Sequence, residues 1–254
     1  MRLTVCELPD DDERRTAAWE QLSRHLQASP TDVLVLPEMP FVSWAAFTTR
    51  VVDPVGWKQM LTEHDAMLSQ FADLGTHIVV GSRPVQEAGR RLNQGFAWTL
   101  ATGIQRGRSK VYLPDAPDGW EATWFERGTL DPAPVTCAGV AIGFQICTEM
   151  LFTDLAWKIG RAGAQLIAAP RATGGHRRWR LAASLMAIVS GCFVASANRR
   201  SYGSDDFAGQ SWIISPEGEV LAETTADRPV ATVTIDIADV TTAKQMYPRN
   251  LPEP

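Results

Sequence analysis

The sequence has no apolar run that approaches the roughly 18 residues of a membrane span, and its 24 Lys and Arg residues form no long basic tract. The N-terminal stretch MRLTVCELPDDDERR turns acidic before a signal-peptide hydrophobic region could form. With 29 Asp and Glu residues the formal net charge is -5, so we expect neither nucleic acid nor a membrane as a partner. These absences predict a soluble, cytoplasmic protein.

Cysteine is also scarce, and the motifs of several enzyme classes are missing. The four cysteines, Cys6, Cys137, Cys147 and Cys192, have irregular spacings and form no CxxC pair, which excludes a disulfide framework and a thiolate zinc site. No GxGxxG, GxxxxGK[ST], HExxH or GxSxG occurs, and the four histidines lie far apart in the sequence. Nucleotide-cradling loops, zinc proteases and serine hydrolases with a nucleophile elbow are therefore excluded.

What is present is apolar material in short segments. Hydrophobic residues make up 45% of the 254 residues, which is enough for one core, and we expect a single domain over residues 1–254. β-branched runs typical of strands cover residues 3–8, 32–36, 77–81, 139–146, 164–170, 192–198, 210–215 and 230–236. Helical spacing of apolar residues covers 12–28, 56–74, 152–162 and 178–190. Strands that alternate with helices predict a layered α/β fold, and residues 212–222 predict a hairpin near the C-terminus.

Three chemically useful side chains stand beside these predicted strands. Glu38 follows the run DVLVLP, and Cys147 ends the run GFQIC directly before a predicted helix, where a helix dipole can stabilise a thiolate and later an oxyanion. Lys110 lies in GRSKVYLP. Taken singly, each has an ordinary explanation: a strand-end surface acid, a small buried hydrophobe and a solvated lysine.

Taken together and in this order, Glu38, Lys110 and Cys147 resemble the nitrilase superfamily of carbon-nitrogen hydrolases. The resemblance extends over nearly the whole chain, because QSWIISPEGEVLAET (210–224) and TVTIDIADV (232–240) are similar to the family's segments after the core. It implies an αββα four-layer sandwich and a Glu-Lys-Cys triad.

Two segments resemble different branches of the family. Residues 110–128 are similar to the N-carbamoylputrescine amidases, and by this resemblance Glu121 corresponds to the family's second pocket glutamate. Residues 147–156 are closer to the omega-amidases. The chain also departs from common family residues at three places. Tyr112 replaces a histidine, Cys6-Glu7 replaces a glutamine, and Thr153-Asp154 replaces a proline and a glutamate. None of these departures touches the triad, so they bear on the choice of substrate.

The resemblance implies a mechanism for amide cleavage. Glu38 takes the proton of Cys147, whose thiolate attacks the carbonyl carbon and forms a thioester that water then hydrolyses. Lys110 and the backbone N–H of Thr148 stabilise the oxyanion, and Glu121 positions the amide and the water. No metal and no organic cofactor is required.

Large apolar side chains near these segments are candidates for the pocket wall, the alternative being that they belong to the core. They are Phe41, Trp44, Trp120, Trp124 and Met150.

Arg171 follows the predicted strand QLIAAP and is a candidate for substrate recognition. At that strand end its planar guanidinium could hold a carboxylate on the acyl side of the substrate, as an omega-amide of a dicarboxylate would present. The alternative is a structural ion pair with a nearby acid such as Glu149.

The sequence therefore predicts a thiol-dependent hydrolase of a small linear amide or N-carbamoyl compound. A nitrile hydrolase that uses the same triad and a non-catalytic binding protein with this fold remain as alternatives. We also expect a homodimer or larger homo-oligomer, in which the predicted helix 152–162 makes the contact.

Overall fold

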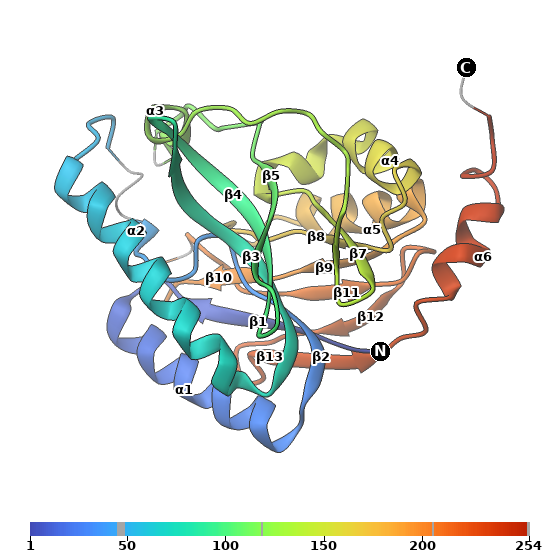
Figure 1. Ribbon diagram of the computed structural model, residues 1–254, viewed down its shortest axis with the longest axis horizontal. Helices are drawn as coiled ribbons and strands as arrows, with labels where there is room; N and C mark the ends of the chain where they lie inside the picture. The colour runs from blue at the N-terminus through green and yellow to red at the C-terminus, as the bar shows by residue number, and fades with distance from the viewer. Residues whose placement is uncertain (45–48, 118, 205, 253–254) are drawn as a thin grey trace.

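The fold is built around two β-sheets that pack face to face. A computed structural model describes residues 1–44, 49–117, 119–204 and 206–252 (Figure 1). The first sheet has the strand order β10-β1-β2-β3-β4-β5, and β13 pairs with Arg2–Cys6 of β1, whereas β10 pairs with Glu7–Pro9. Its strands are β1 (Arg2–Pro9), β2 (Thr31–Val35), β3 (Thr76–Glu87), β4 (Arg90–Thr99), β5 (Gly103–Ser109), β10 (Asn198–Arg200) and β13 (Val230–Thr234).

The second sheet has the order β12-β11-β9-β8-β7-β6, with parallel pairing among β7, β8 and β9. Its strands are β6 (Val135–Cys137), β7 (Val140–Phe144), β8 (Leu166–Ala168), β9 (Phe193–Ser196), β11 (Trp212–Ile214) and β12 (Val220–Glu223). β11 and β12 form the predicted hairpin. In the first sheet, β1, β2 and β3 are likewise parallel.

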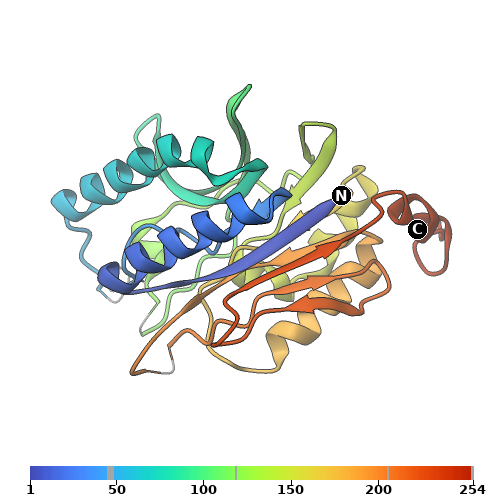
Figure 2. The same ribbon diagram turned by 90° about the horizontal axis from the view of Figure 1, so that it is seen from below.

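Helices cover the outer face of each sheet. α1 (Asp12–Ala28), α2 (Pro54–Leu68) and the 3-10 helix η2 (Ser69–Leu74) pack on the first sheet, where α1 and η2 bury Leu22, Leu26 and Phe71 against it. α4 (Thr153–Arg161) and α5 (Arg178–Ser190) pack on the second. Figure 2 shows the four layers from the side. The predicted αββα sandwich is confirmed.

The interface between the sheets is the central core. Side chains such as Val35 and Val80 from the first sheet meet Phe144 and Leu166 from the second, and all four are at most 1% exposed. The Phe144 ring lies so close to Gly95 and Gly107 that a Cβ on either glycine would come within 2.5 Å of it. These two glycines let the sheets approach beside the segment that carries Lys110.

Three short elements complete the chain. They are α3 (Glu121–Trp124), the 3-10 helix η3 (Cys147–Leu151) and α6 (Asp239–Gln245). None of the helices in the described part of the chain is both long enough and apolar enough to span a lipid bilayer.

Candidate active site

The candidate catalytic residues meet at one edge of the sandwich, beyond the carboxyl ends of its strands. Glu38 follows β2, Lys110 follows β5 and Cys147 follows β7. The two sheets are joined at this edge, because the Glu38 N–H donates to the Arg171 carbonyl oxygen at 3.3 Å and the Cys147 N–H donates to that of Pro170 at 2.9 Å. Both acceptors lie in the segment after β8, which therefore holds the predicted base and the predicted nucleophile side by side.

Lys110 is the centre of a buried ion cluster. Its Nζ donates to Glu38 Oε1 at 2.8 Å and to Glu121 Oε2 at 2.6 Å, and the three residues are at most 2% exposed. Burial acts to lower the pKa of Lys110, but the carboxylates of Glu121 and Glu38 outweigh it and hold the pKa well above its usual range. Lys110 is thus a fixed cation between two acids.

Glu38 offers one carboxylate oxygen that is not used by this cluster. Asn93 in β4 donates from Nδ2 to Glu38 Oε1 at 2.8 Å, so that oxygen has two donors. Glu38 Oε2 is buried and has no hydrogen-bond partner among the described residues. A buried carboxylate oxygen without a donor is costly, and it can accept a proton from a thiol or a water.

Glu121 begins α3 and lies between the ion cluster and the open space above it. Burial raises its pKa to about 7, although the Lys110 ammonium acts in the opposite direction. Near neutral pH this carboxyl group therefore exchanges a proton easily, which suits a group that positions an amide and a water.

Cys147 occupies a sharp turn between β7 and η3. Its φ is +51°, a left-handed conformation that is unfavourable for a residue with a Cβ and that is found at functional sites. Burial, reinforced by the Glu38 charge, raises the pKa of the thiol, and Lys110 opposes this only in part. The resting residue is a thiol rather than the thiolate that a helix dipole alone would favour, so its activation needs a base.

Cys147 opens onto a cavity of about 520 Å³. Glu121 and Thr148 line it beside the thiol, and the Thr148 N–H lies in the first turn of η3, where helical N–H groups have no intrahelical partner. Trp44 forms part of the wall, as predicted. Further wall residues are Asp10, Pro114, Gly119, Ala172, Thr173, Gly174, Trp179, Asp206 and Phe207.

The other predicted wall residues do not line this cavity. Phe41 packs between α1 and the first sheet against Trp19, and Met150 packs in the core beneath α4 and α5. Trp124 is buried in the cluster that also holds Trp44, and half-buried Trp120 lies under the Arg50 guanidinium, 3.8 Å from its ring centre. Phe41, Trp124 and Met150 thus belong to the core.

The structure places Arg171, the predicted substrate-binding residue, among protein partners and not in the cavity wall. The guanidinium donates to Ser196 Oγ at 2.6 Å, to Thr173 Oγ1 at 2.8 Å and to the Gln210 carbonyl oxygen at 2.6 Å, and it stacks 4.0 Å from the Trp212 ring. The residue is 1% exposed and does not line the cavity.

The predicted alternative, an ion pair between Arg171 and Glu149, is wrong, because Glu149 pairs with another arginine. Glu149 pairs with Arg108, which donates to both carboxylate oxygens at 2.5 and 2.9 Å. The same carboxylate accepts the N–H of Val111 at 2.7 Å and that of Ile146 at 2.9 Å. Glu149 therefore ties the residue after Lys110 to the residue before Cys147.

A second buried arginine holds the segment of Glu38. Arg199 donates to the carbonyl oxygens of Glu38 at 3.1 Å and Met39 at 2.6 Å, and it pairs with Asp10. Our reading of the sequence missed Arg199, Asn93, Arg108 and the role of Glu149. Their contacts join segments that lie far apart in the chain, so no local pattern marks them.

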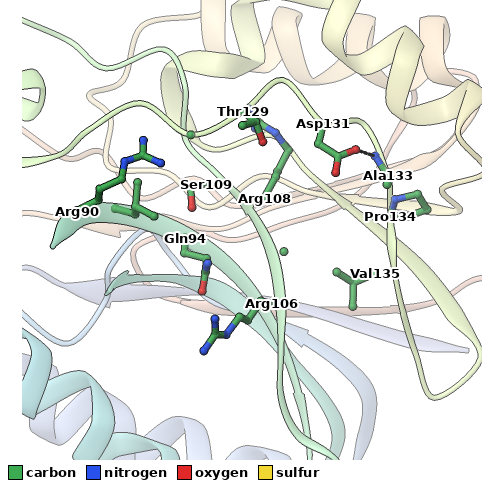
Figure 3. A pocket seen from close by; sticks show the side chains of 13 residues that line it. Arg90, Gln94, Arg106, Arg108, Ser109, Thr129, Asp131, Ala133, Pro134 and Val135 are labelled. Atoms are coloured by element: carbon green, nitrogen blue, oxygen red, sulfur yellow. Dashed lines mark hydrogen bonds between the residues drawn. The ribbon is translucent and has the colours of Figure 1, made fainter. Parts of the chain in front are cut away.

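A cavity of about 370 Å³ lies elsewhere, between β4, β5 and the segment 128–135 (Figure 3). Three arginines line it, and each has an acidic partner: Arg90 pairs with Glu126, Arg106 with Glu87 and Arg108 with Glu149. No member of the cluster around Lys110 lines this cavity, whereas Glu121 and Cys147 both line the other one.

We predict that Arg171→Met lowers kcat/KM for acidic and neutral amides by the same factor, because the side chain does not meet the substrate. The loss of a buried cation with three acceptors should also lower the melting temperature. Kinetics with one acidic and one neutral amide of equal length test this. A loss confined to the acidic amide would return Arg171 to substrate recognition.

The model of the family described as "Carbon-nitrogen hydrolase" matches residues 2–245. The chain belongs to this family. As a carbon-nitrogen hydrolase it is an enzyme that cleaves carbon-nitrogen bonds, which confirms the family resemblance found in the sequence. Among curated proteins it is similar to the omega-amidase NIT2 of Pongo abelii, with 28% identity over 198 residues that cover 73% of this chain and 71% of the relative.

Solved structures of carbon-nitrogen hydrolases share the fold. The carbon-nitrogen hydrolase from Helicobacter pylori G27 has a TM-score of 0.85 at 20% identity, and the match covers 98% of this chain and 94% of that one. A variant of the amidase from Nesterenkonia sp. AN1, to whose active-site cysteine acrylamide has added, has a TM-score of 0.76 at 19% identity and covers 95% of both chains.

Proposed function

We propose that this carbon-nitrogen hydrolase cleaves a small linear amide or N-carbamoyl compound through a thioester on Cys147. The observation that carries the proposal is that the thiol opens onto a cavity whose inner wall carries Glu121, above the buried Glu38–Lys110–Glu121 cluster. Nucleophile, base, fixed cation and second carboxylate are the groups that amide cleavage requires.

The first half-reaction forms the thioester. Glu38 Oε2 takes the thiol proton as Sγ attacks the carbonyl carbon, and the carbonyl oxygen gains the negative charge. Lys110 and the Thr148 N–H stabilise this oxyanion. When it collapses, the carbon-nitrogen bond breaks and the proton passes from Glu38 to the departing ammonia or amine.

The second half-reaction releases the acid. Water held by Glu121 attacks the thioester carbon as Glu38 takes one of its protons. Collapse of the second oxyanion breaks the carbon-sulfur bond, and the thiolate recovers a proton from Glu38. The two half-reactions use groups of this chain and one water.

Ammonia release from a panel of linear amides, ureido acids and nitriles tests the proposal, with intact mass spectrometry after rapid acid quench to trap the acyl-enzyme. We expect release from at least one amide or ureido acid and an acyl adduct on the Cys147 peptide. Turnover of nitriles alone would favour the nitrile-hydrolase alternative. A protein that binds panel members without any turnover would be the non-catalytic alternative.

We further propose that the protein forms a homodimer through the face of α4 and α5. The exposed apolar side chains Leu181 and Leu185, 58% and 45% exposed, lie one turn apart on α5 and face outward. Light scattering at micromolar concentration should give twice the mass of 27.9 kDa, and Leu185→Arg should shift the protein toward monomer. Wild-type protein that is only monomeric would contradict this.

A further inference from the structure

The wall of the catalytic cavity is acidic. Beyond Cys147 and Glu121, its ionisable members are Asp10 and Asp206, and no lysine or arginine lines it within the described part of the chain. The residues outside that part, at 45–48, 118, 205 and 253–254, include no basic side chain. A substrate group that reaches this wall therefore meets carboxylates and, among the described residues, no cationic side chain.

The buried cations near the cavity are already occupied. Lys110 is held by two carboxylates, Arg199 by Asp10 and backbone carbonyls, and Arg171 by neutral oxygen atoms. All three are at most 1% exposed. None of them is free to take up a carboxylate from the cavity.

Asp10 is held in one orientation. Its Oδ1 accepts from Arg199 Nε at 3.0 Å and from the Trp44 N–H at 3.0 Å. Among the described residues, Oδ2 has only a long 3.4 Å contact with Ser43. The carboxylate side chain remains 23% exposed, so a ligand can reach it. Arg199 already balances the charge of Asp10. Asp10 therefore offers Oδ2 as a fixed hydrogen-bond acceptor, which loses little freedom when it accepts a donor from a cation.

Asp206 adds a second negative charge on the outer wall. It is exposed and accepts from Ser204 at 2.7 Å. The aromatic wall also favours a positively charged substrate group. Trp44 and Phe207 pack edge to face with centroids 5.9 Å apart, and the Arg199 guanidinium lies 5.5 and 5.8 Å from their ring centres. Ring faces attract cations and offer nothing to a carboxylate.

From these features we propose that the substrate carries a positive charge, an ammonium or a guanidinium group, at the end remote from the scissile bond, and that Asp10 and Asp206 select it. The inference rests on the proposed amide hydrolysis at Cys147, since it names the class of substrate for that same cavity. This proposal takes the place of the expectation from the sequence that Arg171 binds a substrate with a carboxylate group.

Three linear amides of equal length, ending in an ammonium, a methyl or a carboxylate group, test the inference. We expect kcat/KM to fall in that order, by about tenfold between ammonium and methyl, the effect of one charge-assisted hydrogen bond. Asp206→Lys should reverse the order of the ammonium and carboxylate amides. Asp227→Lys places the same change on an exposed acid that does not line the cavity, and its order should match the wild type.

Binding separates this inference from the proposed reaction. Cys147→Ala protein should bind the ammonium amide more tightly than the methyl amide. The change in tryptophan fluorescence on titration measures both affinities, because Trp44 and Trp179 lie in the cavity wall. If wild-type protein hydrolyses none of the three while this order of binding holds, the reaction fails and the charge selection stands. Equal affinities, a preference for the carboxylate amide, or identical results for Asp206→Lys and Asp227→Lys would overturn the inference.

Discussion

Cys147→Ala is expected to lower kcat by about 10⁴-fold or more, because it removes the nucleophile and with it the covalent route. The fold should survive. The Sγ atom makes only a 3.9 Å contact with the Ala172 carbonyl oxygen, and alanine meets the same backbone conformation as cysteine at this turn. We therefore expect a melting temperature within a few degrees of the wild type, and both quantities should be measured on the same preparation.

Cys192→Ala is the matched control for this experiment. Its thiol is also buried, but it lies after α5 and donates to the Ala164 carbonyl oxygen, away from the cavity. It should keep wild-type turnover while losing some stability. Substantial hydrolysis by purified Cys147→Ala protein would contradict the thioester mechanism, as would a loss of turnover in both variants.

Glu121→Gln is expected to lower kcat/KM by about 10²- to 10³-fold, the cost of one group that stabilises a transition state in a buried site. The amide keeps the shape of the carboxyl group but loses the charge that the Lys110 ammonium meets at 2.6 Å. Lys110 keeps Glu38 as its remaining acidic partner. Glu126→Gln is the control on the same segment, because that exposed side chain pairs only with Arg90 at the surface. Equal kinetics for the two variants would remove Glu121 from the site.

The pH profile gives Glu121 a second test. Burial raises its pKa to about 7, so the group is largely protonated below neutral pH and ionised above it. If the ionised form holds Lys110 and the water, kcat/KM of the wild type rises as the pH increases through about 7. In Glu121→Gln the group cannot titrate, so this limb should vanish from the profile. A limb that persists in the variant would belong to another residue.

Local signals in the sequence predicted the helices well and some strands poorly. The expected helices at 12–28 and 178–190 match α1 and α5 in both bounds, because apolar spacing and end residues are properties of a single segment. β4 and β5 were missed. Their sequences mix charged residues with Gly95 and Gly107, whose presence is explained only by the Phe144 ring of the opposite sheet.

The site likewise contains residues that the sequence could predict and residues that it could not. Glu38, Lys110 and Cys147 could be predicted because each follows a strand and their order matches a family pattern. The anchor that the segments of Lys110 and Cys147 share, the Glu149 carboxylate, depends on how two sheets pack and leaves no trace in any one segment. Arg171 shows the limit of the argument from strand ends, since position at an edge does not fix the direction of a side chain.

The residues that hold the catalytic groups in place are different from the residues that line the cavity for the substrate. Arg108 and Arg199 hold the reactive groups from the interior. The cavity wall outside the sheets carries Trp44, Asp206 and Phe207 on connecting segments and Trp179 in the first turn of α5. Substitutions at these wall positions would change which substrate is accepted, while the catalytic residues kept their geometry. Such an arrangement lets specificity drift during evolution at little cost to chemistry, and it marks these four positions as the place to begin a directed change of substrate.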